Sequence, residues 1–171
     1  MSTLSHSPLF SHRNAASIAA LAAAGLLIAV FMMQYFGGLA PCSLCLTQRW
    51  PHGVALALGL IALMPITAAP ARRLLLALIA LSFAVTAGIG AYHAGVEYGW
   101  FAGPNACSGN ITGNTVEELK RALMAQPVVR CDEVAWSLFG VSLAGFNFLA
   151  STILAVFCAT AAFCGAENDR R

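Results

Sequence analysis

Charged residues are scarce in this chain of 171 residues: 9% are Asp, Glu, Lys or Arg, whereas 59% are hydrophobic. A soluble domain usually carries about a quarter charged residues. So few charges leave too little polar surface to cover a domain in water. The composition therefore excludes an ordinary soluble globular protein and predicts a membrane protein.

A strict alternation of apolar and polar residues is also missing, which excludes a transmembrane β-barrel. The chain has instead four apolar runs, each near the 20 residues that span about 30 Å of hydrocarbon. Every charge lies outside these runs or at their ends. The first run is too long for the apolar core of a cleaved signal peptide, and its basic flank is thin. We predict an all-α membrane protein, a single domain over 1–171, with a four-transmembrane-helix bundle at 15–36, 49–68, 74–95 and 136–163.

Positive charge is distributed unevenly between the two predicted sides. The N-terminal tail, the "APARR" turn and the C-terminal tail together hold five arginines: Arg13, Arg72, Arg73, Arg170 and Arg171. The loop at 96–135 holds three basic and five acidic residues. The positive-inside rule then places both termini in the cytoplasm and the loops at 37–48 and 96–135 outside.

The cysteines follow the same division. Cys42, Cys45, Cys107 and Cys131 fall in the two outer loops, where an oxidising environment lets disulfides persist. The other two are predicted near the cytoplasmic end of the last span, where a free cysteine usually serves as a small apolar side chain. The outer four are therefore the candidates for chemistry.

The pair Cys42-x-x-Cys45 has three interpretations: a redox pair, half of a zinc site, or a structural disulfide. Zinc is disfavoured because Cys107 and Cys131 stand 24 residues apart and form no second close pair. A structural disulfide would suit the long loop, but it gives no reason for a tight thiol pair beside a membrane helix. We favour the redox interpretation and predict no metal.

Residues near the pair support redox chemistry. Cys45 is predicted at the start of the second helix, where the helix dipole favours an anion, and Arg49 lies on the same face one turn deeper. Both features would lower the pKa of the Cys45 thiol, and the thiolate is the reactive form. Such a thiolate can pass electrons to a lipid-soluble quinone, with Arg49 donating a hydrogen bond to a quinone oxygen. The alternative for Arg49 is an ordinary interfacial anchor.

Two further features lie on the outer side. His93, near the outer end of the third span, can donate a hydrogen bond to a quinone or carry a proton, and a purely structural histidine between helices is the open alternative. The segment "NTVEELKRALMA" predicts a short helix with a capping box formed by Thr115 and Glu118. Its apolar residues gather on one side, which predicts an interfacial helix lying flat on the membrane within the second outer loop.

These motifs carry a resemblance. "PCSLCLTQRW" and "CDEVAWSLFGVSLAGFNFLAS" are similar to the bacterial disulfide bond formation protein B (DsbB) family, and the likeness extends from about residue 15 to 164. The resemblance implies a bundle in the bacterial inner membrane with its redox loops in the periplasm. It implies a protein-dithiol:quinone oxidoreductase that reoxidises a periplasmic, DsbA-like thioredoxin-fold dithiol oxidase. The quinone is expected to be ubiquinone rather than menaquinone, and no nucleic acid is expected as a partner.

The resemblance also implies roles for individual residues. The partner's thiolate would attack Cys107, and Cys131 would then exchange with Cys42, so that Cys45 faces the quinone beside Arg49. His93 matches a histidine near the corresponding helix end. One position departs from the pattern: the best-known members carry an acidic residue directly before the arginine, where this chain has Gln48.

Three rival functions stay open. A vitamin K epoxide reductase-like protein uses similar chemistry on a similar bundle, but its C-x-x-C would be expected on the last helix. A membrane scaffold with purely structural disulfides would have inert outer cysteines and a replaceable Arg49. A membrane metal-binding protein is the weakest of the three.

Overall fold

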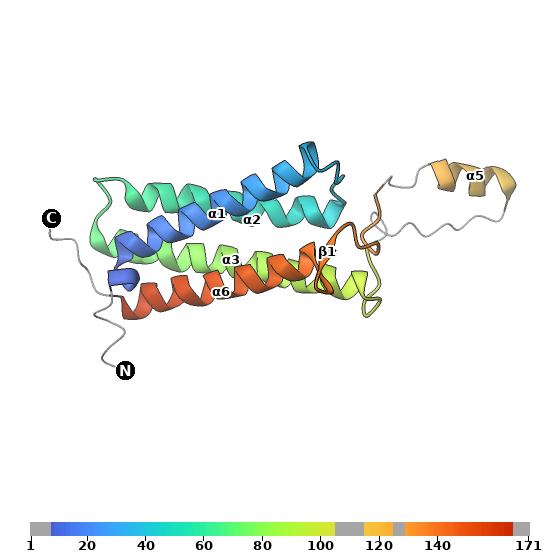
Figure 1. The fold of residues 1–171 in the computed structure, drawn as a ribbon. Helices are drawn as coiled ribbons and strands as arrows, with labels where there is room; N and C mark the ends of the chain where they lie inside the picture. The colour runs from blue at the N-terminus through green and yellow to red at the C-terminus, as the bar shows by residue number, and fades with distance from the viewer. Residues whose placement is uncertain (1–7, 105–114, 125–128, 166–171) are drawn as a thin grey trace.

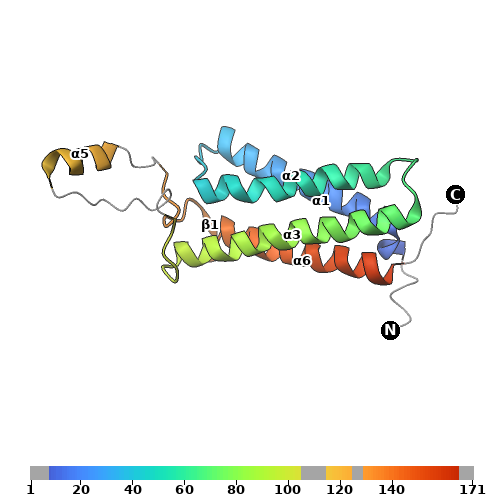
Figure 2. The ribbon, with the colours of Figure 1, turned by 180° about the vertical axis from the view of Figure 1, so that it is seen from behind.

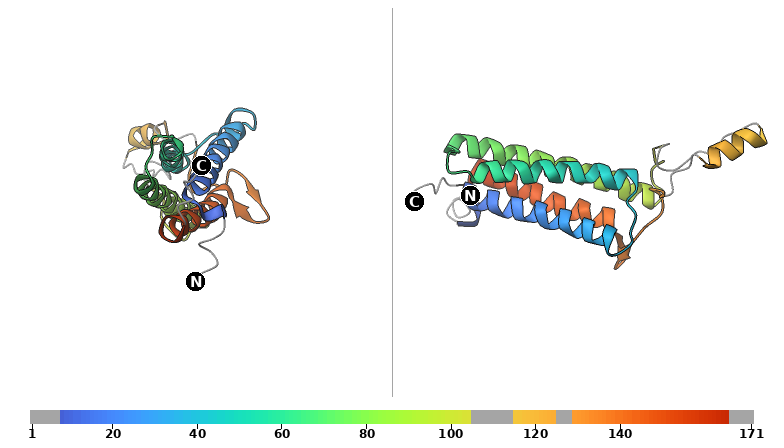
Figure 3. Two further views of the ribbon diagram at one scale, coloured as in Figure 1. Left: turned by 90° about the vertical axis from the view of Figure 1, so that its left-hand side faces the viewer. Right: turned by 90° about the horizontal axis from the view of Figure 1, so that it is seen from above.

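The computed structural model describes residues 8–104, 115–124 and 129–165. Four long helices lie side by side as a bundle (Figures 1 and 2), and seen end-on they surround a common axis (Figure 3). A short 3-10 turn, η2 (Pro8–Phe10), precedes the first helix and lies at the same end of the bundle as the last turn of the fourth. The four helices are α1 (His12–Tyr35), α2 (Ser43–Leu63), α3 (Ala69–Glu97) and α6 (Leu143–Cys164).

Three of these helices, α1, α3 and α6, are long and apolar enough to cross a membrane. The predicted all-α membrane class is therefore confirmed. The helix α2 runs beside them but does not reach the same hydropathy within the described part of the chain, because Gln48, Arg49 and His52 lie in its first half. A fourth crossing, by α2, stays a prediction.

The helix α2 begins earlier than its apolar run. A proline usually limits how far a regular helix extends upstream, yet Pro51 lies inside a helix that starts at Ser43. That early start is possible because Cys42 acts as the N-cap: its sulfur accepts a hydrogen bond from the backbone N–H of Cys45 at 3.2 Å. The first outer loop is correspondingly short.

The helix α3 also begins earlier than predicted, and it absorbs the "APARR" segment. Pro70 lies in its first turn, where a missing N–H costs nothing. Arg72 is buried and donates hydrogen bonds to the carbonyl oxygens of Ala62 and Thr67, both at 2.9 Å. The arginine thus satisfies carbonyl groups at the end of α2 and in the turn that follows it.

The helix α6 begins later than predicted, at Leu143, because the residues before it form a hairpin. Its strands, β1 (Ser137–Leu138) and β2 (Val141–Ser142), pair antiparallel. Phe139 and Gly140 between them have φ values of 52° and 78°, the left-handed pair that a two-residue hairpin turn requires.

The predicted loop helix is present as α5 (Val116–Met124). The backbone N–H of Glu118 bonds to the Thr115 hydroxyl at 3.2 Å, which is one half of the predicted capping box. The helix lies apart from the bundle (Figure 1). Its position on a membrane surface stays a prediction.

Small residues let α1 and α2 approach closely. Alanines of α1 and α2 lie in the buried core, which Leu76, Ile79 and Phe83 of α3 complete. A Cβ added to Gly59 would lie 2.9 Å from the Cβ of Ala20. Towards the start of α2, α1 instead leans away from α6 (Figures 1 and 2).

We therefore expect Gly59→Ala to lower the thermal unfolding temperature of the detergent-solubilised protein, because overpacking a tight contact costs about 1–3 kcal/mol. Gly88→Ala is the matched control, since a Cβ there meets nothing within 4 Å and alanine favours a helix over glycine. Equal unfolding temperatures for the two variants would contradict the close packing of α1 on α2.

Candidate thiol redox site and adjoining cavity

A cavity of about 340 Å³ lies where α1 leans away from the bundle. Apolar side chains of α1 line one wall, among them Leu26, Val30 and Met33. The polar lining comes mainly from α2 and α3 and includes Cys42, Cys45, Gln48, Arg49, His52, His93 and Glu97. A largely apolar cavity with a few convergent polar groups is typical of a small-molecule site.

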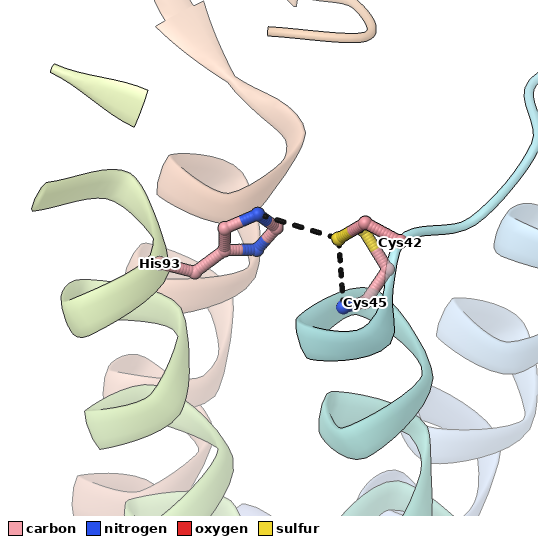
Figure 4. A group of neighbouring side chains, drawn as sticks. All are labelled: Cys42, Cys45 and His93. Carbon is pink, nitrogen blue, oxygen red and sulfur yellow. Dashed lines mark hydrogen bonds between the residues drawn. The ribbon is translucent and has the colours of Figure 1, made fainter. Parts of the chain in front are cut away.

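Three groups lie within hydrogen-bonding distance of the Cys42 sulfur, and dashed lines in Figure 4 join two of them, the Cys45 backbone N–H and the His93 ring, to it. The backbone N–H of Cys45 lies 3.2 Å from that sulfur, the Cys45 thiol 2.9 Å, and Nε2 of His93 3.6 Å. The hydrogen bond from the Cys45 thiol, followed by that from His93, lowers the pKa of Cys42 well below its usual value, although burial opposes the shift. Cys42 is therefore the thiol that this arrangement favours as a thiolate.

The favoured thiolate is therefore Cys42 and not, as the sequence had predicted, Cys45. The sequence placed Cys45 at the helix start, whereas Cys42 occupies the N-cap and Cys45 is the third residue of the helix. The sulfur at the N-cap faces the unpaired N–H groups of the first turn, so the stabilisation predicted for Cys45 falls on Cys42. Cys45 instead keeps its proton, because its hydrogen bond with Cys42 and its burial raise the pKa of the Cys45 thiol.

Arg49 lines the same cavity as Cys45. Its Nη1 donates to Oε1 of Gln34 at 2.6 Å, and its guanidinium lies 5.0 Å from the centre of the Phe31 ring. Two residues of α1 thus hold the cation in place through a hydrogen bond and a cation–π contact. Sequence reasoning missed Gln34, although an amide near the end of an apolar run is a usable signal.

His93 joins the thiol pair to a buried polar network. Its Nδ1 lies 2.8 Å from Nε2 of Gln48, and its Nε2 lies 3.9 Å from Oε1 of Glu97. Gln48 in turn accepts from Nδ2 of Asn147 on α6 at 2.6 Å. Glu97 and Asn147 were not predicted as site residues; a lone amide within the last apolar run was the only sign of Asn147.

His52 belongs to the same network. Its Nε2 lies 2.8 Å from Oδ1 of Asn147, and its ring lines the cavity. The other ring nitrogen, Nδ1, is buried and has no hydrogen-bond partner among the described residues. Because a buried polar atom without a partner is costly, this nitrogen is available to a bound ligand.

Cys131 lies against the thiol pair from the other side. It is disulfide-bonded, completely buried, and packed against Cys42 and Val96. The hydroxyl of Ser43 lies 3.8 Å from its sulfur. The predicted partner, Cys107, lies outside the described residues. The arrangement places a disulfide sulfur beside Cys42, while Cys45 faces the cavity.

An ion pair braces the segment around Cys131. Arg130 donates two hydrogen bonds to Asp132, at 3.0 and 2.6 Å. The hydrogen bonds from Arg130 also hold the pKa of Asp132 below its ordinary value. The ion pair joins the two residues that flank Cys131 in the chain.

The donor atoms of Cys42, Cys45 and His93 lie within 4.8 Å of one another, a set that can also hold a metal ion such as zinc. The other two free cysteines lie elsewhere: Cys158 is buried in the apolar core and Cys164 is exposed at the end of α6. Both fit the predicted role of small apolar side chains better than a role in chemistry.

A thiol pair at the start of a membrane bundle, next to a disulfide-bonded cysteine, defines a membrane thiol oxidoreductase. The family model for disulfide bond formation protein DsbB matches residues 12–161. The chain belongs to the DsbB family. The resemblance drawn from the sequence motifs is thereby confirmed, and with it a part in disulfide bond formation.

Individual relatives agree with this assignment. A disulfide bond formation protein B from Saccharophagus degradans is 32% identical over 146 residues, covering 82% of this chain and 86% of its own. One from Verminephrobacter eiseniae is 31% identical over 149 residues, covering 83% and 81%. An uncharacterized protein, RP370, from Rickettsia prowazekii is 25% identical over 130 residues, covering 74% of both chains. No solved structure matches the chain.

The site yields a prediction about Cys42. In reduced protein, Cys45→Ala removes a hydrogen-bond donor to the Cys42 sulfur, whereas Cys45→Ser keeps one. A hydrogen bond to a charged group contributes about 1.5–3 kcal/mol, which corresponds to about one to two pKa units. Because a lower pKa lets the thiolate persist to lower pH, losing the donor should move the midpoint of Cys42 alkylation upward in Cys45→Ala.

Alkylation of Cys42 can be followed across pH by mass spectrometry of its peptide, which separates it from the other thiols. Cys45→Ser should stay close to the wild type. A midpoint that is the same in the two variants would show that the Cys45 side chain does not stabilise the Cys42 thiolate.

Proposed function

We propose that this chain is a protein-dithiol:quinone oxidoreductase of the bacterial inner membrane, which reoxidises a periplasmic, DsbA-like thioredoxin-fold dithiol oxidase. The observation that carries the proposal is the position of the thiol pair. Cys42 packs against the disulfide-bonded Cys131, while Cys45 lines a cavity that also holds Arg49. The pair therefore stands between a protein disulfide and a site for a small molecule.

In the proposed topology α2 also crosses the membrane, which makes four crossings with α1, α3 and α6. Both termini are cytoplasmic and the redox loops face the periplasm. The five arginines assigned to the inner side support this orientation. The structure also supports placing both termini on one side, because η2 and the last turn of α6 lie at the same end of the bundle (Figure 1). The cysteine site lies at the other end, where α2 begins.

Electrons would enter through the long loop. A thiolate of the partner attacks Cys107, breaks the proposed Cys107–Cys131 bond, and leaves the electron pair on the sulfur of Cys131. The Cys131 thiolate then attacks Cys42 in the oxidised Cys42–Cys45 pair and leaves the electron pair on Cys45. The contact between Cys131 and Cys42 in the buried cluster supports this second step.

The low pKa of Cys42 suits the step that follows. When the partner closes its own disulfide, the Cys107 thiolate is released and attacks Cys131, re-forming the loop disulfide and expelling Cys42 as a thiolate. A thiol of lower pKa leaves faster. The contacts of Cys42 with Cys45 and His93 therefore favour its release. The bond between Cys42 and Cys45 would re-form when the pair gives two electrons and two protons to a quinone.

The cavity residues fit a quinone. A bound quinone would accept two electrons and two protons from the thiol pair. Arg49, held by Gln34 and Phe31, supplies a fixed positive charge near Cys45 for an oxygen that becomes negative. Nδ1 of His52 is a free acceptor on the same lining. The preference for ubiquinone over menaquinone rests on the resemblance alone.

An apolar groove extends from the cavity along the seam between α1 and α6. Its lining, Ala22, Gly25, Leu26, Ala150, Ile153 and Leu154, shares Leu26 and Ala150 with the cavity. The groove is lined by apolar side chains, which suit the binding of a hydrocarbon chain. We propose that the isoprenoid tail of the quinone lies here.

The rival functions fit less well. A scaffold with structural disulfides gives no reason for a pair of free thiols, one of which, Cys42, is hydrogen-bonded to a buried histidine. A vitamin K epoxide reductase-like protein would place its thiol pair on the last helix, whereas the pair here starts α2. A metal site would use the same three donors, so the turnover experiment includes a chelator.

The central prediction concerns turnover. Purified protein in detergent, given ubiquinone and a reduced thioredoxin-fold oxidase, should consume the ultraviolet absorbance of the quinone catalytically, with or without chelator. Cys45→Ser should abolish quinone reduction. Arg49→Met should slow it by about 10–100-fold, because an electrostatic donor at a developing charge is worth a few kcal/mol.

Cys158→Ser is the matched control, because this thiol is buried in the core away from the cavity, and it should turn over at the wild-type rate. Absence of turnover with ubiquinone and with menaquinone, in protein whose outer cysteines stay paired, would favour the structural scaffold. Loss of activity on adding chelator would favour the metal site.

The groove yields a separate prediction. Gly25→Leu fills it from α1, where the position has open space, and should lower kcat/KM for a long-tailed ubiquinone more than for a tailless analogue. Gly88→Leu, which also meets open space but lies outside the groove, should change neither value. An equal loss with both quinones would contradict the tail site.

A further inference from the structure

We propose that Gln48, held by Asn147, is a positioning residue that keeps the proton of His93 on Nε2, where it faces the sulfur of Cys42. The catalytic value of this arrangement rests on the proposed function. The tautomer itself can be tested without quinone or partner.

The backbone carbonyl of Thr86 can only accept a hydrogen bond. Nδ2 of Asn147 lies 3.4 Å from that oxygen. The same nitrogen lies 3.1 Å from the Thr86 hydroxyl, whose own proton is directed to the carbonyl oxygen of Gln48, also at 3.1 Å. Two acceptors on one side of Asn147 therefore fix its amide with the NH₂ group towards Thr86.

The orientation of Asn147 determines that of Gln48. Nδ2 of Asn147 also donates to Oε1 of Gln48 at 2.6 Å. The oxygen of Gln48 is therefore turned to Asn147, and its NH₂ group is turned to His93, where Nε2 lies 2.8 Å from the ring Nδ1. An NH₂ group can only donate, so Nδ1 must be the acceptor and carries no proton.

The neighbours of the other ring nitrogen agree. Nε2 of His93 faces the sulfur of Cys42 at 3.6 Å and Oε1 of Glu97 at 3.9 Å. A thiolate and a carboxylate can only accept, so a proton on Nε2 satisfies them and a lone pair there would repel them. Gln48 and His93 are both buried, so water does not offer an easy substitute for either bond.

Glutamine is suited to this role because it accepts at one end and donates at the other. An ionised glutamate at the same position could only accept, and it would draw the proton of His93 to Nδ1. The lone pair of Nε2 would then face Cys42 unless the ring took a second proton. The amide at position 48 therefore lets a neutral His93 support the thiolate.

The test is the tautomer of His93 in full-length, reduced protein labelled with ¹⁵N-histidine and held in detergent. The ¹⁵N chemical shift of a ring nitrogen reports whether it carries a proton, and His93→Gln identifies the His93 signals. We expect a proton on Nε2 and none on Nδ1 in the wild type. In Gln48→Glu we expect Nδ1 to be protonated, and in Gln48→Met we expect both tautomers.

The pKa of Cys42, measured by alkylation of its peptide across pH, is the second readout. Gln48→Met should raise it by about one unit, because the donor from His93 is no longer held in place. The groups facing Cys42 that could also shift this value are Cys45, His93 and Glu97, with Arg49, Arg130 and Glu133 along the same cavity. All six are unchanged in Gln48→Met.

Ser151→Ala is the control, because the Ser151 hydroxyl bonds to Oδ1 of Asn147 and stands outside the chain of donors that leads to His93. It should leave the tautomer and the pKa unchanged. A proton on Nδ1 in the wild type overturns the proposal, even if Gln48→Met fails to fold. So does a Gln48→Met protein with the wild-type tautomer and an unchanged Cys42 pKa. Neither result bears on quinone reduction, which the turnover experiment tests separately.

Discussion

The hydrogen bonds to the buried sulfur of Cys42 are the constraint on which the site depends. A buried anion is costly unless it is hydrogen-bonded, and the donors come from different parts of the chain. The first turn of α2 supplies an N–H group and the Cys45 thiol, and α3 supplies His93. Because α6 orients His93 through Asn147 and Gln48, three helices must pack correctly for one thiolate to form.

Packing of the bundle meets this requirement with small and polar residues in separate regions. Alanine and glycine let α1 lie tightly on α2 away from the thiols, where Gly59 leaves no room for a methyl group. Nearer the thiols α1 leans outward, and polar side chains of α2, α3 and α6 fill the interior. A tight end and an open end of one bundle thus provide stability and a binding site respectively.

Much of this could be predicted from the sequence because its signals are local. The helix count follows from long apolar runs, and the loop helix from the spacing of Thr115 and Glu118, whose cap bond is present. The face shared by Cys45 and Arg49 follows from helical periodicity. The early start of α2 was missed because the N-cap is a cysteine, which is not among the residues that usually mark a helix start.

The polar network was beyond sequence reasoning for a different reason. Gln34, Gln48, His52 and Asn147 come from three helices, and only tertiary packing brings them together. Gln34, His52 and Asn147 are each polar residues within a predicted apolar run, where such a residue most often bonds to a neighbouring helix, and Gln48 falls in the predicted outer loop. The sequence pattern of each helix does not show how the helices are aligned with one another. That alignment decides whether these four residues lie together in a site.

The outward lean of α1 has one more consequence. The proposed enzyme would meet its two substrates in different phases, a protein from the aqueous side and a quinone moving sideways in the bilayer plane through the seam of α1 and α6. The two would not compete for one entrance, so each half-reaction can proceed while the other substrate is departing. The quinone level that governs the rate is then its mole fraction among the lipids, a quantity that the volume of surrounding water does not dilute.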